Sequence, residues 1–344
     1  MKIQARTLLI VLLLLLIGIY AGYRFILGGA EVPRSIGDDF SVKIPSNSTF
    51  DEVVALLKKE GVVKKEIIFR NVAKQMGYKQ DPMRSGRYKI EPGWTVFHLV
   101  RHLRSGEQAP VKVILTTERT LEEVAEKVSR FIEPDSTSLK ALLFDEAYLS
   151  KMGYNRDNLM SVFIPNTYEV YWNLSPESFM ERMLLEHKNF WKQKDRLAKA
   201  KAMGMTPEEV YTMASIVEKE TLSDDEKPII AGTYLNRIKI GMRLQADPTV
   251  VFATRDFTTK RVTNYHTSFD SPFNTYMYAG LPPGPIAMAS ISSIDAVLNF
   301  DKNNYTYFCA IGDGSGRHAF AETYDQHLGN VRTYVKNLEA RGLR

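Results

Sequence analysis

Glu218 is a carboxylic acid placed where an expected helix passes from buried to exposed, a position from which it could donate a proton. Residues 206–221 predict this helix, because Thr206 and Glu209 form a Thr-x-x-Glu capping box and Pro207 suits the first helical position. An apolar stripe follows, formed by Val210, Met213, Ala214 and Val217. At about 100° per residue, Glu218 lies at the edge of that stripe and Lys219 is expected to face solvent. Because burial disfavours a charged carboxyl, the pKa of Glu218 should be raised. The alternative is an ordinary solvated glutamate near a helix end.

Two segments after this helix carry polar side chains suited to binding a sugar. Asp247-Pro248 predicts the cap and first residue of a short helix, so that Gln245 and Asp247 flank one turn. The loop 271–286 is dense in Pro, Gly, Asn and Tyr, which is typical of an ordered loop that presents amides and aromatic faces. Amides can bond sugar hydroxyls and tyrosines can stack on sugar rings, although an ordinary turn-rich connection would have the same composition.

The next helix after Glu218 should leave this residue at a rim. Ser223-Asp-Asp-Glu226 has the pattern of a second capping box, and Pro228 falls in the first turn of a helix that runs to about Ile240. The short link between the two helices makes them pack antiparallel or form a corner.

Composition bounds the class of protein. The chain has 344 residues and a formal net charge of +5, enough for two or three domains. Acidic and basic residues are interleaved without a Lys/Arg run, which argues against nucleic-acid binding. Cys309 is the single cysteine, so an intrachain disulfide is excluded, and we expect it to be buried. His98 and His102 have the i, i+4 spacing of a metal pair but lack a third ligand nearby, so we expect neither a metal nor a cofactor.

The amino terminus predicts a single membrane-spanning helix. Residues 7–28 are almost wholly apolar and long enough to cross a hydrocarbon core, and Lys2 and Arg6 precede them. The positive-inside rule leaves residues 1–6 in the cytoplasm and the rest, after a linker at 29–39, outside it. A cleaved signal peptide is the alternative, but the apolar run is longer than the usual signal sequence.

A strand, a turn, a Ser or Thr cap and an amphipathic helix recur three times before residue 132. The copies are 42–57, 88–100 and 113–125, with a further helix at 65–76. The first two copies look like LysM modules, which bind N-acetylglucosamine polymers, and this suggests a LysM-like domain at 40–110; a structural spacer is the alternative. The remainder, 111–344, predicts a mixed α+β domain with a strand at 305–311, and the Gly-rich stretch 312–318 is best explained as a hairpin connection.

Five ordered motifs resemble the endolytic murein transglycosylase (YceG-like) family. They are Ala214-Ser-Ile-Val-Glu-Lys-Glu220, Gly232-Thr-Tyr-Leu-Asn-Arg237, Gly241-Met-Arg-Leu-Gln-Ala-Asp-Pro-Thr249, Ser271-Pro-Phe-Asn-Thr-Tyr276 with Gly280-Leu-Pro-Pro-Gly-Pro-Ile286, and Gly314-Ser-Gly-Arg-His-Ala-Phe320. The resemblance extends from the amino-terminal anchor to the last helix. Where the family pattern has an Asp and a Glu, this chain has Asn166 and Gln326.

This resemblance implies an inner-membrane enzyme that cuts peptidoglycan strands internally on the periplasmic side. The family's catalytic glutamate falls on Glu218. Its substrate-binding positions fall on Gln245, Asp247, Asn274, Tyr276, His318 and Phe320. The family also implies termination of nascent strands and contact with penicillin-binding proteins.

A lytic transglycosylase needs one carboxyl group, because the attacking nucleophile is the C6 hydroxyl of the N-acetylmuramic acid itself. We expect Glu218 to protonate the glycosidic oxygen and then take the C6 hydroxyl proton, which leaves a 1,6-anhydro end. A muramidase would need a second acid, for which Glu220, Asp247 and Glu169 are the candidates. A non-catalytic scaffold that binds peptidoglycan is the alternative from another class.

Overall fold

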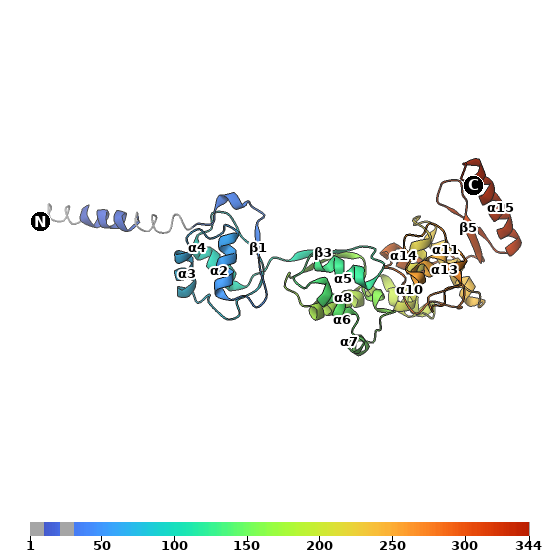
Figure 1. Ribbon diagram of the computed structural model, residues 1–344, viewed down its shortest axis with the longest axis horizontal. Helices are drawn as coiled ribbons and strands as arrows, with labels where there is room; N and C mark the ends of the chain where they lie inside the picture. Colours follow the sequence, from blue (N-terminus) through green and yellow to red (C-terminus); the bar gives the residue numbers. More distant parts are fainter. Residues whose placement is uncertain (1–9, 21–30, 344) are drawn as a thin grey trace. The chain divides into compact units, whose positions relative to one another are not determined.

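The computed structural model describes residues 10–20 and 31–343 (Figure 1). The chain divides into two compact units. The first contains the residues up to Lys112 together with 131–133 and 169–174, and the second contains 113–130, 134–168 and the residues from Ser175 onward. Each unit is described by itself.

Between residues 31 and 110, the described part of the first unit contains two short strands and three α-helices. Its elements are a 3₁₀ turn η1 (Arg34–Ile36), β1 (Ser41–Ile44), α2 (Phe50–Lys59), α3 (Glu66–Gln75), β2 (Gly86–Lys89) and α4 (Val96–Ser105). The strands pair antiparallel, with Val42 opposite Tyr88. Thr49 and Thr95 cap α2 and α4, as the repeated pattern predicts. Side chains that are fully buried in this unit, such as Leu57 and Phe69, form its own core.

The expected membrane segment is described in part. Residues 10–20 are helical and their apolar side chains are exposed. Residues 7–9 and 21–28 of that segment lie outside the described residues. In the two described ranges, no helix is both long enough and apolar enough to cross a membrane.

The second unit is mainly helical. Its elements, some of which begin or end in the first unit, are β3 (Val111–Leu115), α5 (Leu121–Ser129), α6 (Ser136–Leu143), α7 (Glu146–Lys151), η2 (Leu159–Val162), β4 (Asn166–Val170), α8 (Pro176–Lys192), η3 (Gln193–Asp195), α9 (Arg196–Ala202), α10 (Pro207–Glu220), α11 (Lys227–Lys239), α12 (Asp247–Thr254), α13 (Asn264–Thr267), α14 (Ile291–Leu298), β5 (Tyr307–Ala310), β6 (His318–Ala321) and α15 (Tyr324–Ala340). β3 pairs with β4, and β5 pairs antiparallel with β6. The prediction of a mixed α+β fold is therefore confirmed at this coarse level.

Helix α10 forms the centre of the second unit. The capping box of Thr206 and Glu209 begins it, as expected, and every residue from Val210 to Val217 is buried. It packs against α9, α11, α12 and α14, of which α11 and α14 are labelled beside it in Figure 1. Burial on all sides makes α10 a core helix, so the groups at its end have a rigid base.

Two of the expected helix starts are wrong. Ser223 does not cap α11, which begins at Lys227 after Glu226 without a side-chain cap, because the carboxylate of Glu226 binds His318 instead. Asp247 lies inside α12, and Ala246 occupies its cap position.

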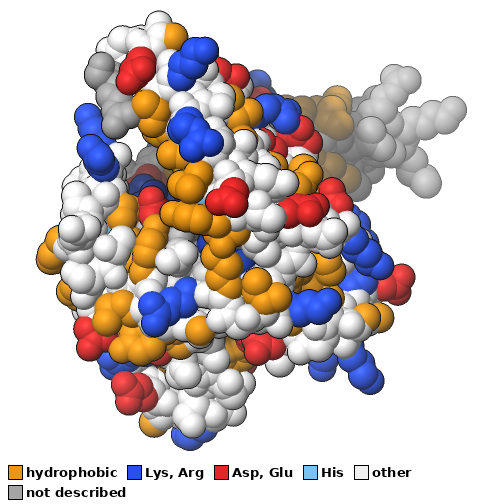
Figure 2. All heavy atoms as spheres, turned by 90° about the vertical axis from the view of Figure 1, so that its right-hand side faces the viewer, with side chains coloured by type: hydrophobic (Ala, Val, Ile, Leu, Met, Phe, Trp, Pro, Cys, Tyr) orange, Lys and Arg blue, Asp and Glu red, His pale blue; other side chains and the backbone are white. Residues whose placement is uncertain are grey.

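The carboxyl-terminal strands and α15 form a layer attached to α11. The hairpin β5–β6 has the expected connection through 311–317, and Cys309 is half-buried rather than buried. Arg237 donates from Nε to the carbonyl oxygen of Thr306 at 2.6 Å, and Asn236 donates to that of Tyr305 at 2.9 Å. Figure 2 looks at the end of the second unit that carries α15, where acidic and basic side chains are interspersed around hydrophobic ones.

Candidate active site

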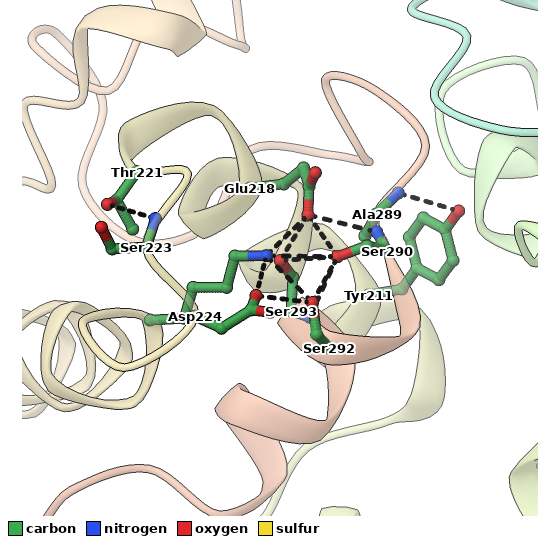
Figure 3. A network of polar contacts seen from close by, with 10 residues as sticks. Tyr211, Glu218, Thr221, Ser223, Asp224, Ala289, Ser290, Ser292 and Ser293 are labelled. Carbon is green, nitrogen blue, oxygen red and sulfur yellow. Dashed lines mark hydrogen bonds and ion pairs between the residues drawn. The ribbon is translucent and has the colours of Figure 1, made fainter. Parts of the chain in front are cut away.

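Glu218 lies in the last turn of α10 with 13% of its side chain exposed. Its Oε2 atom accepts a short hydrogen bond from the Ser290 hydroxyl, a second at 2.5 Å from the Ser293 hydroxyl, and a longer one at 3.4 Å from the Ser290 N–H (Figure 3). Among the described residues, every hydrogen bond to this carboxylate ends on Oε2. Oε1 is therefore the oxygen that can exchange a proton with a substrate.

The two serines belong to the start of α14. Ser290 is its N-cap and accepts a hydrogen bond from the N–H of Ser293 at 3.2 Å. The N–H of Ala289 donates to the hydroxyl of Tyr211 at 3.1 Å, which fastens this segment to α10 (Figure 3). The carboxylate of Glu218 thus lies at the amino end of a helix, where unpaired N–H groups favour a negative charge.

Lys227 supplies a buried positive charge to the same cluster. Its Nζ lies 3.5 Å from Oε2 of Glu218, 2.8 Å from a carboxylate oxygen of Asp224 and 2.9 Å from the hydroxyl of Ser292. The side chain of Lys227 is 6% exposed, whereas that of Asp224 is 73% exposed. The buried Lys227 therefore contacts Glu218 from the protein interior, and the exposed Asp224 contacts Lys227 from the solvent.

The pKa of Glu218 is lowered, which contradicts the expectation from the sequence. Burial alone would raise this pKa, but hydrogen bonds from Ser290 and Ser293 and the charge of Lys227 together outweigh it. Glu218 is thus a carboxylate at neutral pH. The Glu218 carboxylate can accept a proton, and it must be protonated before it can act as a general acid.

The raised pKa that the sequence predicts for Glu218 is found instead at Glu220. Helix α10 continues through Glu220, whose Oε1 accepts a hydrogen bond from the hydroxyl of Tyr234 at 2.5 Å. Burial raises the pKa of Glu220 to about 7; the Tyr234 hydrogen bond opposes that rise and the charge of Asp247 adds to it. Glu220 therefore exchanges its proton near neutral pH.

A pocket of about 270 Å³ opens beside Glu220. Its walls are formed by Arg119, Lys219, Glu220, Asp247, Pro248, Val251, Phe252, Phe257, Thr259 and Ile286. Lys219 was expected to face solvent, but it is half-buried in this wall. The wall combines residues of α10 and α12, which pack against each other.

The structure brings three of the expected substrate-binding residues to this region. Tyr276 donates its hydroxyl hydrogen to Asp247 at 2.5 Å, so the loop 271–286 reaches the pocket wall. Burial and the bond to Asp247 raise the pKa of Tyr276, which keeps its hydroxyl protonated. Gln245 has an exposed side chain, and its N–H donates to the carbonyl oxygen of Thr275 at 3.1 Å. Asp247, Gln245 and Tyr276 therefore occupy adjoining segments.

Asn274 serves the loop itself. It is fully buried, and its amide donates to the carbonyl oxygens of Thr267 and Phe269 at 3.0 and 2.7 Å. Its Oδ1 accepts a hydrogen bond from the N–H of Tyr276 at 2.9 Å. In this structure Asn274 therefore shapes the backbone that presents Tyr276, and its role as a substrate-binding residue stays a prediction.

His318 and Phe320 lie in β6, in the carboxyl-terminal layer. Nδ1 of His318 is 3.0 Å from Oε2 of Glu226, and its N–H donates to Oε1 at 2.9 Å. Phe320 stacks on Tyr305 with ring centroids 5.5 Å apart. Both side chains attach the hairpin to the core, and neither lines the pocket beside Glu220.

Glu169 and the two positions that differ from the family pattern, Asn166 and Gln326, make only local contacts or face solvent. Glu169 is exposed in β4 and belongs to the first unit. Asn166 bonds the N–H of Thr167, and Gln326 completes the capping box of α15. Within the described ranges, His, Cys, Asp and Glu side chains form no group of three or more that could hold a metal ion.

Sequence reasoning missed the partners of Glu218. Ser290 could have been found, because a serine followed by apolar residues at helical spacing is a typical N-cap. Ser293 follows from the same pattern as the third residue of that helix. Lys227 carries no signal of its own, since a lysine in a first helical turn is usually solvated.

Comparisons with known proteins agree with these motifs. Residues 42–333 match the YceG-like family. An endolytic murein transglycosylase of Streptococcus pneumoniae serotype 2 is 28% identical over 361 residues, which cover 96% of this chain and 64% of that relative. One of Bacillus subtilis strain 168 is 28% identical over 314 residues, covering 86% of this chain and 85% of that relative. The chain thus spans less than two thirds of the length of the pneumococcal relative.

A solved structure has the same fold over most of the chain. A yceG-like protein from Listeria monocytogenes matches with a TM-score of 0.56 and 25% identity, covering 85% of this chain and 98% of that one. The family match covers most of the sequence, including the segments that hold Glu218, Lys227 and Ser290. The chain belongs to the YceG-like family.

Proposed function

We propose that this chain is an endolytic lytic transglycosylase that cleaves the bond between N-acetylmuramic acid and N-acetylglucosamine within peptidoglycan strands. The observation that carries the proposal is the half-buried carboxylate of Glu218, whose Oε2 is fixed by Ser290, Ser293 and Lys227 and whose Oε1 has no hydrogen-bond partner among the described residues. The names of the pneumococcal and Bacillus relatives support the same activity.

Glu218 acts twice in this reaction. It first gives a proton to the glycosidic oxygen as the bond from that oxygen to C1 breaks. As a carboxylate it then takes the proton of the C6 hydroxyl while O6 bonds to C1, so the strand ends in a 1,6-anhydro ring and no water is consumed. The second step, removal of the C6 hydroxyl proton, needs Glu218 as a carboxylate, which is the form that Ser290, Ser293 and Lys227 stabilise.

The first step requires a protonated Glu218. A bound sugar strand excludes water from the carboxyl group, and this desolvation raises its pKa against the pull of Lys227 and the two serines. Fixing one oxygen through Oε2 aims the other at the substrate. Ser290, Ser293 and Lys227 therefore orient the carboxyl group of Glu218, and they also lower its pKa before substrate binds.

A muramidase is the second candidate, and Glu220 is the observation that favours it. Its pKa of about 7 and its place in the pocket wall suit a group that could activate a water molecule. In that reaction the product would carry a reducing end instead of an anhydro end.

Mass spectrometry of the products separates these functions. The full-length protein in detergent is incubated with uncrosslinked glycan strands, together with Glu218→Gln and Glu220→Gln. We expect the wild type and Glu220→Gln to produce anhydro ends and Glu218→Gln to produce none. Reducing ends that both changes abolish would establish the muramidase, and a cellular role that survives Glu218→Gln would point to a non-catalytic scaffold.

The placement of the protein is part of the proposal. Residues 7–28 would anchor it in the inner membrane, with the enzymatic part on the periplasmic side. The LysM-like unit would bind the glycan, and contact with penicillin-binding proteins would place the enzyme beside nascent strands. Protease digestion of intact and permeabilised spheroplasts tests the orientation, because residues after 39 should be cleaved in spheroplasts whose inner membrane is intact.

A further inference from the structure

The pocket beside Glu220 contains two positively charged side chains, Arg119 and Lys219, that form no salt bridge among the described residues. Within the described part of the chain, neither the guanidinium of Arg119 nor Nζ of Lys219 makes a hydrogen bond or salt bridge. The guanidinium lies over the ring of Phe257, 5.1 Å from its centroid. Both side chains are half-buried and line the same pocket. Unpaired cations in a concave site are costly unless a ligand completes them.

Among the described residues, the two acids in the pocket wall form no salt bridge with Arg119 or Lys219. Glu220 accepts the hydroxyl of Tyr234, and Asp247 accepts that of Tyr276. Burial, and then the nearby charge of Arg119, lowers the pKa of Lys219, and the charges of Glu218 and Glu123 oppose only part of that shift. The two cations therefore repel each other, and a bound anion would relieve that repulsion.

The size and walls of the pocket restrict the ligand. About 270 Å³ is less than the volume of typical sites for drug-sized ligands, so it suits one substituent and not a disaccharide. Val251, Phe252 and Ile286 provide apolar surface for the carbon part of that substituent. A short carboxylate arm on a sugar ring has both properties.

We propose that Arg119 and Lys219 form a subsite for the carboxylate carried by the N-acetylmuramic acid residue of the substrate. This inference rests on the proposed function, and the subsite lies within electrostatic reach of the proposed acid, because the charge of Glu218 acts on Lys219. The carboxylate has two sources: the lactyl group of a strand without peptides, or the stem peptide of an intact strand.

The test measures binding and cleavage separately. Arg119→Gln and Lys219→Gln are combined with Glu218→Gln for binding by calorimetry, and kept alone for kinetics. Lys219→Arg retains the charge, and Lys239→Gln removes an exposed lysine of α11 as the matched control. The ligands are intact strands, strands treated with an amidase to free the lactyl carboxylate, and chitooligosaccharides of equal length, which have no carboxylate.

Each glutamine variant should weaken binding and raise KM about tenfold for the carboxylate-bearing strands, since one charge-assisted hydrogen bond contributes about 1.4 kcal/mol. Binding of chitooligosaccharides should not change, and Lys219→Arg should restore most of the affinity. A loss confined to intact strands assigns the site to the stem peptide, and a loss confined to amidase-treated strands assigns it to the lactyl group.

Two results would overturn the inference. Equal losses for chitooligosaccharides would make Arg119 and Lys219 general structural residues, and unchanged affinity for both carboxylate ligands would leave the subsite without a function. If the wild-type protein cleaves strands while either result holds, the proposed function survives and the inference alone fails. If the wild-type protein neither binds nor cleaves any strand, both fail.

Discussion

Replacing Lys227 by methionine tests whether the buried ion pair sets the charge of Glu218. At 3.5 Å and an effective dielectric constant of about 20, the attraction between the two charges is about 5 kcal/mol. Burial of both groups opposes part of this, and the serines still bind the carboxylate in the variant. We therefore expect a coupling energy of about 1–3 kcal/mol between Lys227 and Glu218.

A double-mutant cycle measures this coupling. The free energy of unfolding is obtained from urea titrations of the wild type, Lys227→Met, Glu218→Gln and the double variant, with Lys239→Met as the control for loss of an exposed lysine. The double variant should be less destabilised than the sum of the single ones. A coupling energy near zero would refute the contribution of Lys227 to the lowered pKa of Glu218.

The same pair predicts a pH dependence. Because the pKa of Glu218 is lowered in the folded protein, its carboxylate stabilises the fold above the ordinary value of 4.5, and this contribution is lost as the pH falls through the folded value. Without Lys227 the contribution is smaller, so the difference between wild type and Lys227→Met should shrink in acid. A constant difference across the titration would contradict the mechanism. Because the first step of cleavage needs a protonated Glu218, whose pKa should rise without Lys227, the alkaline limb of cleavage should also move to higher pH in the variant.

Three further changes test other parts of the site. Glu220→Gln should remove a decline in unfolding free energy between pH 4.5 and about 7, because the raised pKa makes the folded protein bind a proton that the unfolded chain releases; a wild type without that decline would contradict it. Asn274→Ala should cost about 2–3 kcal/mol in urea titrations by leaving buried backbone groups unpaired, whereas unchanged stability with weaker glycan binding would restore its role as a ligand. Gly284→Ala should cost about 3 kcal/mol or prevent folding, since a Cβ there would lie 1.8 Å from the carbonyl oxygen of Asp157, while Gly329→Ala, which has room, should have no such cost.

Local patterns in the sequence were sufficient to predict the elements that position the site. The capping box at Thr206 and the apolar stripe gave helix α10 with its start and its buried face, because both depend on residues within a few turns. The strand and helix copies capped by Thr49 and Thr95 followed from the same local chemistry.

The electrostatics of Glu218 could not be predicted in this way. Its pKa depends on hydroxyl groups that lie 72 and 75 residues later in the chain and on Lys227 across a turn. A helical projection gives the direction of a side chain but not what packs against it. For that reason Lys219 was expected in solvent and lies in a pocket wall, where Arg119 and α12 meet it.

The role of a side-chain amide could not be predicted from the sequence either. An asparagine in a loop rich in glycine and proline can bind a ligand or its own backbone, and the composition is the same in both cases. The structure assigns Asn274 to the backbone, because both of its polar atoms are occupied there. Glu226 was expected to complete a cap and instead binds His318, which is 92 residues away.

Glu226 and Lys227 are consecutive, and one binds the carboxyl-terminal hairpin while the other binds Glu218. This adjacency limits how freely the protein can be recombined. A chimera that takes residues 307–340 from a relative inherits more than a surface layer, because a poorly matched hairpin would pull on the residue beside the partner of the acid. The carboxyl-terminal layer is therefore a poor place for a domain exchange, although it lies outside the pocket, unless the segment around Glu226 and Lys227 is exchanged with it.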